Sequence, residues 1–204
     1  MSPIAANLQA VRRRISEALQ GDSRAITLVA VSKSHPCEAI RAAYEAGCRD
    51  FGENYLQDAL PKLTTLHDLT AAWHFIGHLQ SNKAREVATH FDWVHAVDRA
   101  KVALALSRSR PSERGDLNVC IQVNISGETT KGGVAPSHAL ALAREIRGLP
   151  RLKLRGLMGM ASLTADLPLQ HRQFALLRRT REELSAAGIA LDTLSMGMSQ
   201  DFEA

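Results

Sequence analysis

Apolar and polar residues follow two alternating rhythms along the chain. Seven short runs rich in apolar and β-branched residues predict strands, at residues 26–31, 49–52, 73–76, 93–97, 118–124, 154–160 and 191–196. Segments between them carry apolar residues at helical spacing and predict helices, at residues 36–46, 56–66, 81–90, 99–108, 136–147 and 169–187. Several strands are apolar at successive positions, as parallel strands covered on both faces are. The alternation predicts a single α/β domain over residues 1–204.

A further helix is predicted near the start of the chain. Its apolar residues recur at helical spacing: Ile4, Leu8, Val11, Ile15 and Leu19. The opposite face of this helix is rich in arginine and is expected to be solvated. An arginine-rich start also occurs in transit peptides, but the regular helical spacing favours an element of the fold.

The pattern leaves two architectures open, an open doubly wound sheet and a closed β/α barrel. An eight-unit barrel typically needs about 250 residues, and the chain has 204, so it is short by about one unit. In both architectures ligands gather at the carboxyl ends of the strands. Functional residues are therefore expected directly after the predicted strands.

Composition excludes several classes of protein. With 45% hydrophobic and 23% charged residues, the chain resembles globular domains rather than disordered chains, collagens or coiled coils. No apolar run approaches the ~18 residues that span a bilayer. Cys37, Cys48 and Cys120 match neither a disulfide framework nor a zinc site, so we expect a cytoplasmic protein. The formal charge of +4 is spread along the helices, which argues against a nucleic-acid partner.

Lys33 is the first candidate for chemistry, because it directly follows the strand at 26–31. We expect its side chain to be partly desolvated there. Desolvation lowers the pKa of an ammonium group, and a neutral amine condenses with an aldehyde to form a Schiff base. Lysine is scarce, with 19 arginines to 6 lysines, and the other lysines lie in predicted helices, in a loop or before a strand. A phosphate-pairing or simply exposed lysine remains the alternative.

Polar clusters also follow the second, third and seventh strands, at residues 52–55, 76–83 and 196–199. Asn54 and Ser81 could cap the helices that come next. The Gly-Met-Ser turn at 197–199 could present backbone N–H groups and a hydroxyl to a phosphate, or simply cap a helix. His74 and His78 have the spacing of metal ligands on a helix, but they fall in a strand and a turn without an HExxH motif, so we expect no metal.

Taken in order, six blocks of sequence closely resemble the pyridoxal phosphate homeostasis protein family. These blocks are Leu-Val-Ala-Val-Ser-Lys (28–33), Phe-Gly-Glu-Asn-Tyr-Leu-Gln (51–57), Trp-His-Phe-Ile-Gly-His-Leu-Gln-Ser-Asn-Lys (73–83), Val-Asn-Ile-Ser (123–126), Leu-Arg-Gly-Leu-Met (154–158) and Leu-Ser-Met-Gly-Met-Ser-Gln-Asp (194–201). They extend over nearly the whole chain and are together far more specific than any single block.

The resemblance implies a single (β/α)₈ TIM barrel like the N-terminal domain of alanine racemase, which binds pyridoxal 5'-phosphate (PLP). In the family's motifs, Lys33 forms the Schiff base with PLP. The same motifs place Asn54 and Ser199 at the cofactor, with Ser199 near its phosphate. Further residues expected to line the pocket are Ser195, Met198, Ile76 and Gly77.

The resemblance also implies a function. Family members carry or buffer PLP and contribute to vitamin B6 and amino-acid homeostasis without established turnover. A related racemase needs a second domain and a tyrosine base from a partner subunit, whereas Tyr44 and Tyr55 are predicted in helices. We therefore expect a monomeric, non-membrane carrier that can pass PLP to apoenzymes. A PLP-dependent amino-acid racemase is the main alternative, and an RNA-binding module using the arginine-rich helices is the second.

The sequence departs from the family pattern in one respect. The family continues into a final βα unit with an Arg-Ile-Gly-Thr motif, which supplies phosphate contacts and an arginine facing the pyridine nitrogen. That unit is absent from these 204 residues. The resemblance therefore predicts that this chain by itself forms an open barrel with reduced affinity for PLP.

Overall fold

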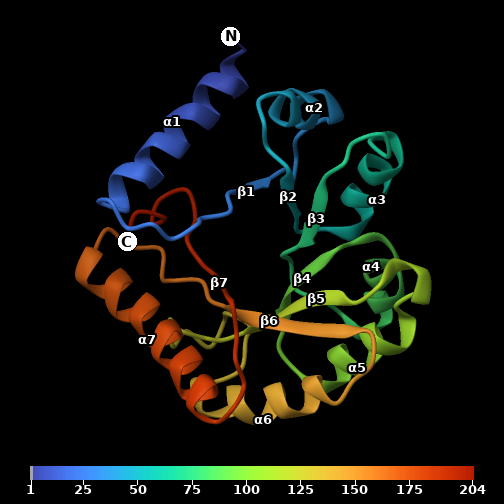
Figure 1. Cartoon of the computed structure of the whole chain (residues 1–204), viewed down its shortest axis with the longest axis vertical. Coiled ribbons are helices and arrows are strands. Elements are labelled where there is room, and N and C mark those ends of the chain that lie inside the picture. The colour runs from blue at the N-terminus through green and yellow to red at the C-terminus, as the bar shows by residue number, and fades with distance from the viewer. Residues whose placement is uncertain (1) are drawn as a thin grey trace.

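In the computed structural model, which describes residues 2–204, seven parallel strands curl into an open barrel (Figure 1). Each strand pairs with the next strand in the chain, so the spatial order is β1 to β7. The strands are β1 Val29–Val31, β2 Asp50–Glu53, β3 Ala72–Phe75, β4 Trp93–Val97, β5 Leu117–Gln122, β6 Leu152–Met158 and β7 Thr193–Ser195. The predicted α/β barrel architecture is thereby confirmed.

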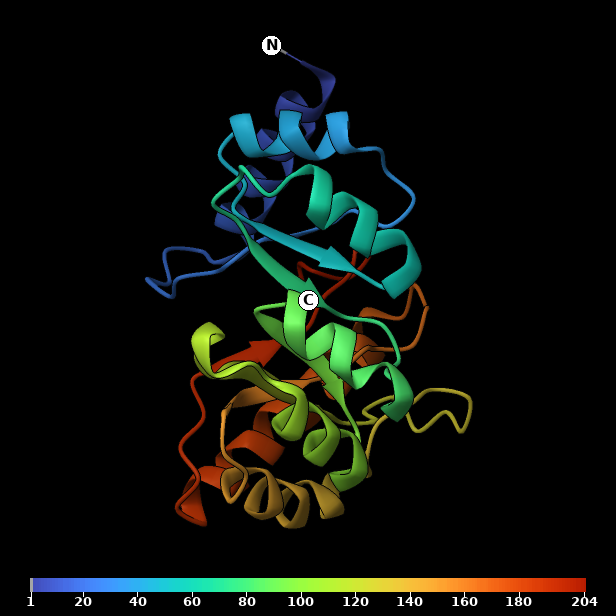
Figure 2. The same cartoon turned by 90° about the vertical axis from the view of Figure 1, so that its right-hand side faces the viewer.

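Helices cover the outer face of the curled sheet, and Figure 2 shows α2 to α6 in succession along it. The α-helices are α1 Pro3–Ala18, α2 Cys37–Glu45, α3 Leu56–Thr65, α4 Ala84–His90, α5 Ala100–Ser109, α6 Pro136–Arg147 and α7 Leu167–Ala186. Two short 3₁₀ turns are Ser81–Lys83 and Ser112–Arg114. The helix predicted at 81–90 is therefore a 3₁₀ turn followed by α4. The predicted first helix is present, and Ser2 caps it by accepting a hydrogen bond from the Ala5 N–H at 3.3 Å.

The two edge strands are shorter than the sequence predicts. The pattern predicts strands at 26–31 and 191–196, but β1 and β7 have only three residues each. Each pairs with one neighbour only, and within residues 2–204 the sheet is open between them. Ile26 and Met196, which the apolar pattern places in these strands, lie outside them and are exposed. Apolar character alone cannot extend a strand where the backbone lacks a partner to pair with.

The barrel has two apolar regions of different size. The large one lies between the sheet and the helices and includes Phe51, Phe91 and Leu157. The small one lies on the inner face of β4, β5 and β6 and consists of Ala96, Cys120 and Met158 with Trp93 and Met160 packed against it. The remaining interior contains buried histidines, which are described below.

The first helix lies beside the last residues of the chain (Figure 1). The Arg14 guanidinium donates two hydrogen bonds to the Glu203 carboxylate, at 2.8 and 2.9 Å. It also lies 4.6 Å from the centre of the Phe202 ring. These contacts hold α1 across the opening between the two edge strands.

Candidate functional site

Lys33 lies at the carboxyl end of β1, as the sequence predicts, but its surroundings differ from the prediction. The side chain is exposed rather than partly desolvated. The reason is that β1 is an edge strand, so within residues 2–204 only β2 flanks it in the sheet. Ser34 follows with a φ of 62°, which turns the chain sharply away from the strand. The amine of Lys33 is therefore accessible to a ligand at this end of the barrel.

A buried ion pair supports the backbone directly before Lys33. The Glu53 side chain is fully buried, and its Oε1 accepts hydrogen bonds from Ser32 Oγ at 2.7 Å and Lys62 Nζ at 2.8 Å. Lys62 also donates to the backbone oxygen of Ser32 at 2.8 Å. This cluster ties α3 to the ends of β1 and β2. Sequence analysis did not identify it, because only the fold brings these residues together.

Asn54 follows Glu53 and is pressed against the end of the next strand. A Cβ atom on Gly77 would lie 1.9 Å from the Asn54 backbone oxygen, so only glycine fits there. The Ile76 N–H donates a hydrogen bond to the backbone oxygen of Glu53 at 2.9 Å. This bond also holds the ends of β2 and β3 together. The segments that contain Asn54, Ile76 and Gly77 therefore meet at one end of the sheet, beside β1.

Three buried acceptor atoms have no hydrogen-bond partner in residues 2–204. Two of them, Asn54 Oδ1 and Glu53 Oε2, lie at the end of β2, and the third is Gln170 Oε1 in the first turn of α7. Buried polar atoms are normally paired, so unpaired acceptors at the end of the strand that pairs with β1 mark a place where a ligand or water can complete the bonding. Tyr55 is predicted in a helix but is the residue before α3, and it is 55% exposed.

The Gly-Met-Ser turn after β7 occupies the same end of the barrel at the opposite edge of the sheet. Gly197 has a φ of 86°, and a Cβ there would lie 3.0 Å from Phe202 Cα. The Met198 N–H donates to the buried Asp201 carboxylate, so this group is not free for an anion as the sequence suggests. Ser199 is exposed, and no hydrogen bond of its hydroxyl is found in residues 2–204. Met198 is 39% exposed.

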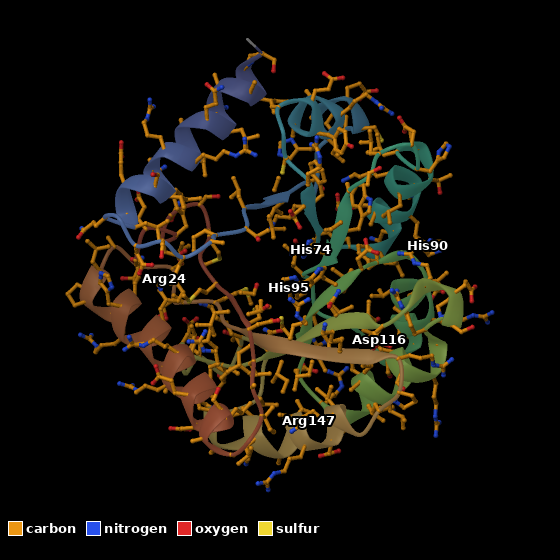
Figure 3. All side chains as sticks on the ribbon, viewed as in Figure 1. Arg24, His74, His90, His95, Asp116 and Arg147 are labelled. Carbon is orange, nitrogen blue, oxygen red and sulfur yellow. The ribbon has the colours of Figure 1, made fainter. Side chains whose placement is uncertain are left out.

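A hydrogen-bonded chain crosses the barrel interior and ends at Ser195. Asp50 Oδ1 lies 3.1 Å from His74 Nε2, His74 Nδ1 lies 2.9 Å from His95 Nε2, and His95 Nδ1 lies 2.7 Å from Ser195 Oγ. Both imidazoles are buried, and Figure 3 labels them inside the curl of the sheet. Sequence analysis considered His74 only as a metal ligand and did not single out His95. Each histidine sits within a strand, and its inward direction was the missing information.

The environment of the two imidazoles keeps them neutral. Burial lowers the pKa of His74, against the opposing effect of Asp50. Burial and the neighbouring His74 lower the pKa of His95 to about 3. Trp93 stacks on His74 with ring centres 5.5 Å apart.

Within residues 2–204, no group of three or more His, Cys, Asp or Glu side chains is arranged to hold a metal ion. The same residues contain no helix long and apolar enough to cross a membrane.

Comparison with known proteins extends this description. The alanine racemase N-terminal domain family matches residues 2–204. The pyridoxal phosphate homeostasis protein of Pseudomonas aeruginosa is 53% identical over 207 aligned residues, which cover 100% of this chain and 89% of that protein. The protein of the same name from Escherichia coli is 45% identical, with 100% of this chain and 90% of that protein covered.

Solved structures of related proteins have the same fold. PipY of Synechococcus elongatus without PLP is similar with a TM-score of 0.87 and 38% identity, covering 98% of this chain and 91% of that one. PipY with PLP bound has a TM-score of 0.81 and 37% identity, with 93% and 90% covered. Alanine racemase of Clostridium difficile shares the fold, with a TM-score of 0.77 at 14% identity. The chain therefore belongs to the alanine racemase N-terminal domain family and, within it, to the pyridoxal phosphate homeostasis proteins.

Proposed function

We propose that this protein binds PLP covalently through Lys33 and carries or buffers it in the cytoplasm, without turnover of its own. The observation that carries the proposal is the exposed Lys33 at the carboxyl end of β1, with the unpaired, buried Asn54 Oδ1 at the carboxyl end of the paired strand β2. The relatives named as pyridoxal phosphate homeostasis proteins and the PLP-bound PipY structure support it. We further propose that residues 1–204 act as one cofactor-binding domain, that the chain is a monomer, and that PLP-dependent apoenzymes receive the cofactor.

The residues at the carboxyl ends of β1, β2 and β7 fit this cofactor. PLP supplies an aldehyde, which a lysine amine attacks to form a C=N bond with the loss of one water. Lys33 offers the amine, Asn54 an unpaired buried acceptor and Ser199 a hydroxyl that can donate to a phosphate. Ser195, Met198, Ile76 and Gly77 stay predicted lining residues.

The neighbouring lysine does not compete with Lys33. Lys62 is mostly buried, and its Nζ is held by the Glu53 carboxylate and the Ser32 backbone oxygen. Because both of these hydrogen bonds hold the Lys62 Nζ in a mostly buried position, the group is not free to attack an aldehyde. The same ion pair fixes Ser32, so it positions the residue that precedes Lys33.

A racemase would need an acid and a base placed at the reacting carbon. The tyrosines do not supply them. Tyr44 lies on α2 with the Arg49 guanidinium 3.9 Å from its ring centre, near the amino ends of the strands. Tyr55 is exposed and makes no side-chain hydrogen bond within residues 2–204. This arrangement favours a carrier over a racemase.

Borohydride reduction tests the proposal. The 204-residue chain is mixed with PLP, reduced, digested and analysed by mass spectrometry, beside Lys33→Ala and the control Lys101→Ala, which removes an exposed lysine from α5. We expect the reduced adduct on Lys33 in the wild type and in Lys101→Ala, and its loss in Lys33→Ala. An adduct of equal yield in Lys33→Ala would contradict the proposal. Racemase turnover above about 1 per second would contradict the carrier role.

A further inference from the structure

The chain of hydrogen bonds from Asp50 to Ser195 crosses three neighbouring strands and then joins β4 to β7, which are not neighbours in the sheet. Asp50, His74 and His95 come from β2, β3 and β4, whereas Ser195 ends β7 on the other side of the barrel. His95 and Ser195 are 100 residues apart in the sequence, and their side chains lie 2.7 Å apart. The chain therefore runs from the amino end of β2 through the interior to the carboxyl end of β7, beside the proposed cofactor site.

The position of one charge sets the direction of every hydrogen bond in this chain. A carboxylate has no proton to donate, so Asp50 accepts and His74 Nε2 carries the proton. A neutral imidazole has one N–H, so His74 Nδ1 is then an acceptor and His95 Nε2 must donate to it. By the same reasoning His95 Nδ1 is an acceptor, and its donor is the Ser195 hydroxyl.

The surroundings support this single arrangement. Burial lowers the pKa of both imidazoles, that of His95 to about 3, so each ring has one proton at neutral pH. The nearby Asp92 carboxylate is already engaged by the Trp73 N–H at 2.9 Å and by Arg114 at 2.8 Å. The Arg155 guanidinium lies over the Trp93 ring, 4.8 Å from its centre. Among the described residues, only Asp50 brings a carboxylate into hydrogen-bond contact with the chain.

We propose that this one-way hydrogen-bond chain makes Ser195 Oγ an acceptor toward the barrel mouth, so that it receives an N–H or O–H donor and does not hold the phosphate. The only proton of its hydroxyl is donated inward to His95, which leaves oxygen lone pairs for a ligand. A phosphate group at neutral pH mainly accepts hydrogen bonds, so it finds no donor at Ser195. The hydroxyl of Ser199 is left to bind it. The identity of the ligand rests on the proposed function, whereas the direction of the chain does not.

The direction of the chain can be measured in the protein without PLP. Long-range ¹H–¹⁵N correlation spectra of the labelled chain report which ring nitrogen of each histidine carries the proton, with His95→Gln to assign the signal. We expect the proton on Nε2 of both His74 and His95. In Asp50→Asn, whose amide can donate or accept, we expect His95 to become a mixture of tautomers. A proton on His95 Nδ1, or a doubly protonated ring at neutral pH, would overturn the proposal, and the wild-type spectrum decides this by itself.

Two aldehydes then test the role of Ser195 toward the ligand. PLP and pyridoxal differ only in the phosphate, and borohydride fixes each of them on Lys33. The variants are Ser195→Val, its matched control Ser195→Thr, which keeps the hydroxyl, and Ser199→Ala. We expect Ser195→Val to weaken the retention of both aldehydes about tenfold relative to Ser195→Thr, and Ser199→Ala to weaken that of PLP alone. Loss of PLP retention alone in Ser195→Val would overturn the proposal, as would equal retention in Ser195→Val and Ser195→Thr.

Failure of this inference and failure of the proposed function give different results. If the wild-type chain forms no adduct on Lys33 with either aldehyde, the proposed function fails, whereas the tautomers in the protein without PLP still decide the direction of the chain. If the adduct forms but His95 carries its proton on Nδ1, the proposed function stands and the inference about Ser195 is overturned.

Discussion

The two ends of the barrel each bury a charged cluster, and the clusters differ in how fully their polar atoms are paired. At the amino ends of the strands, the Arg110 side chain follows α5 and the residue is 2% exposed. Its guanidinium donates hydrogen bonds of 2.7–3.0 Å to four backbone oxygens, those of Ala88, Phe91, Arg114 and Gly115. Every one of these partners is neutral.

At the carboxyl ends, the Glu53 carboxylate is paired with Lys62 and Ser32 through one oxygen only. Its second oxygen has no partner in residues 2–204, nor has the neighbouring Asn54 Oδ1. Fully paired buried groups contribute to the fold, whereas unpaired ones mark a place where something else binds. This contrast favours a stabilising role for the Arg110 end and agrees with the proposed ligand site at the Glu53 end, the end at which β/α barrels bind ligands.

The largest effect is expected from Arg110→Met, which removes the donors but keeps much of the apolar volume. Four backbone oxygens lose their partner, and at roughly 1 kcal/mol each the free energy of unfolding should fall by about 4 kcal/mol. Urea denaturation of both proteins measures this. Arg110→Lys is the control: it keeps the charge but loses the planar fork of donors, so it should recover only part of the loss. A loss below about 1 kcal/mol in Arg110→Met would remove the structural role.

Lys62→Met should lower the free energy of unfolding by about 3 kcal/mol, because it leaves the buried Glu53 carboxylate without its cation. The double variant Glu53→Gln/Lys62→Met removes both charges and should recover most of this loss. Urea denaturation of the single and double variants provides the measurement. If the double variant is as unstable as Lys62→Met, the cost does not come from an unpaired charge.

Between the two ends, the barrel buries the imidazole of His95 in its neutral form. Burial and the neighbouring His74 lower the pKa of His95 from its ordinary value of 6.5 to about 3. The unfolded chain takes up a proton below about pH 6.5 that the folded protein does not, so stability falls as the pH is lowered. The expected loss is about 1.4 kcal/mol per pH unit, or about 2 kcal/mol between about pH 6.5 and about pH 5.

Urea denaturation over this pH range measures the loss, and His95→Gln, which cannot titrate, serves as the control. The pH dependence should be shallower in that variant. Equal slopes in the two proteins would mean that His95 does not contribute to the loss of stability in acid.

The smallest effect is expected at the surface. Arg155 donates to both carboxylate oxygens of Asp192 at 2.9 Å, but the Asp192 side chain is 59% exposed. Burial alone would raise the pKa of Asp192, but hydrogen bonds from Arg155 and Thr193 outweigh it and lower that pKa. The pair therefore stabilises the protein above the ordinary pKa near 3.8 and loses this effect as the pH falls. Asp192→Asn should cost less than about 1 kcal/mol by urea denaturation, and less still in high salt. A loss as large as that in Lys62→Met would be inconsistent with an exposed pair.

The sequence predicts what depends on local pattern. The strand-and-helix alternation predicts all seven strands, and the end of a strand locates Lys33. It does not predict the exposure of Lys33, because that depends on the neighbours of β1. Nor does it predict the chain that ends at Ser195, because His95 and Ser195 are brought together only by the curl of the sheet. The sequence also does not predict the burial of Arg110. The 3₁₀ turn at Ser112–Arg114 brings the backbone oxygen of Arg114 to its guanidinium.

The strand order has a consequence for synthesis of the protein. Because each strand pairs with the one before it in the sequence, the sheet can be added to strand by strand while the chain emerges from the ribosome. From β2 onward, each strand finds its first partner already made. The sequence separation between paired strands is therefore that of a single βα unit throughout the sheet. The contact between Arg14 and Glu203, 189 residues apart, can form only once Glu203 has been made.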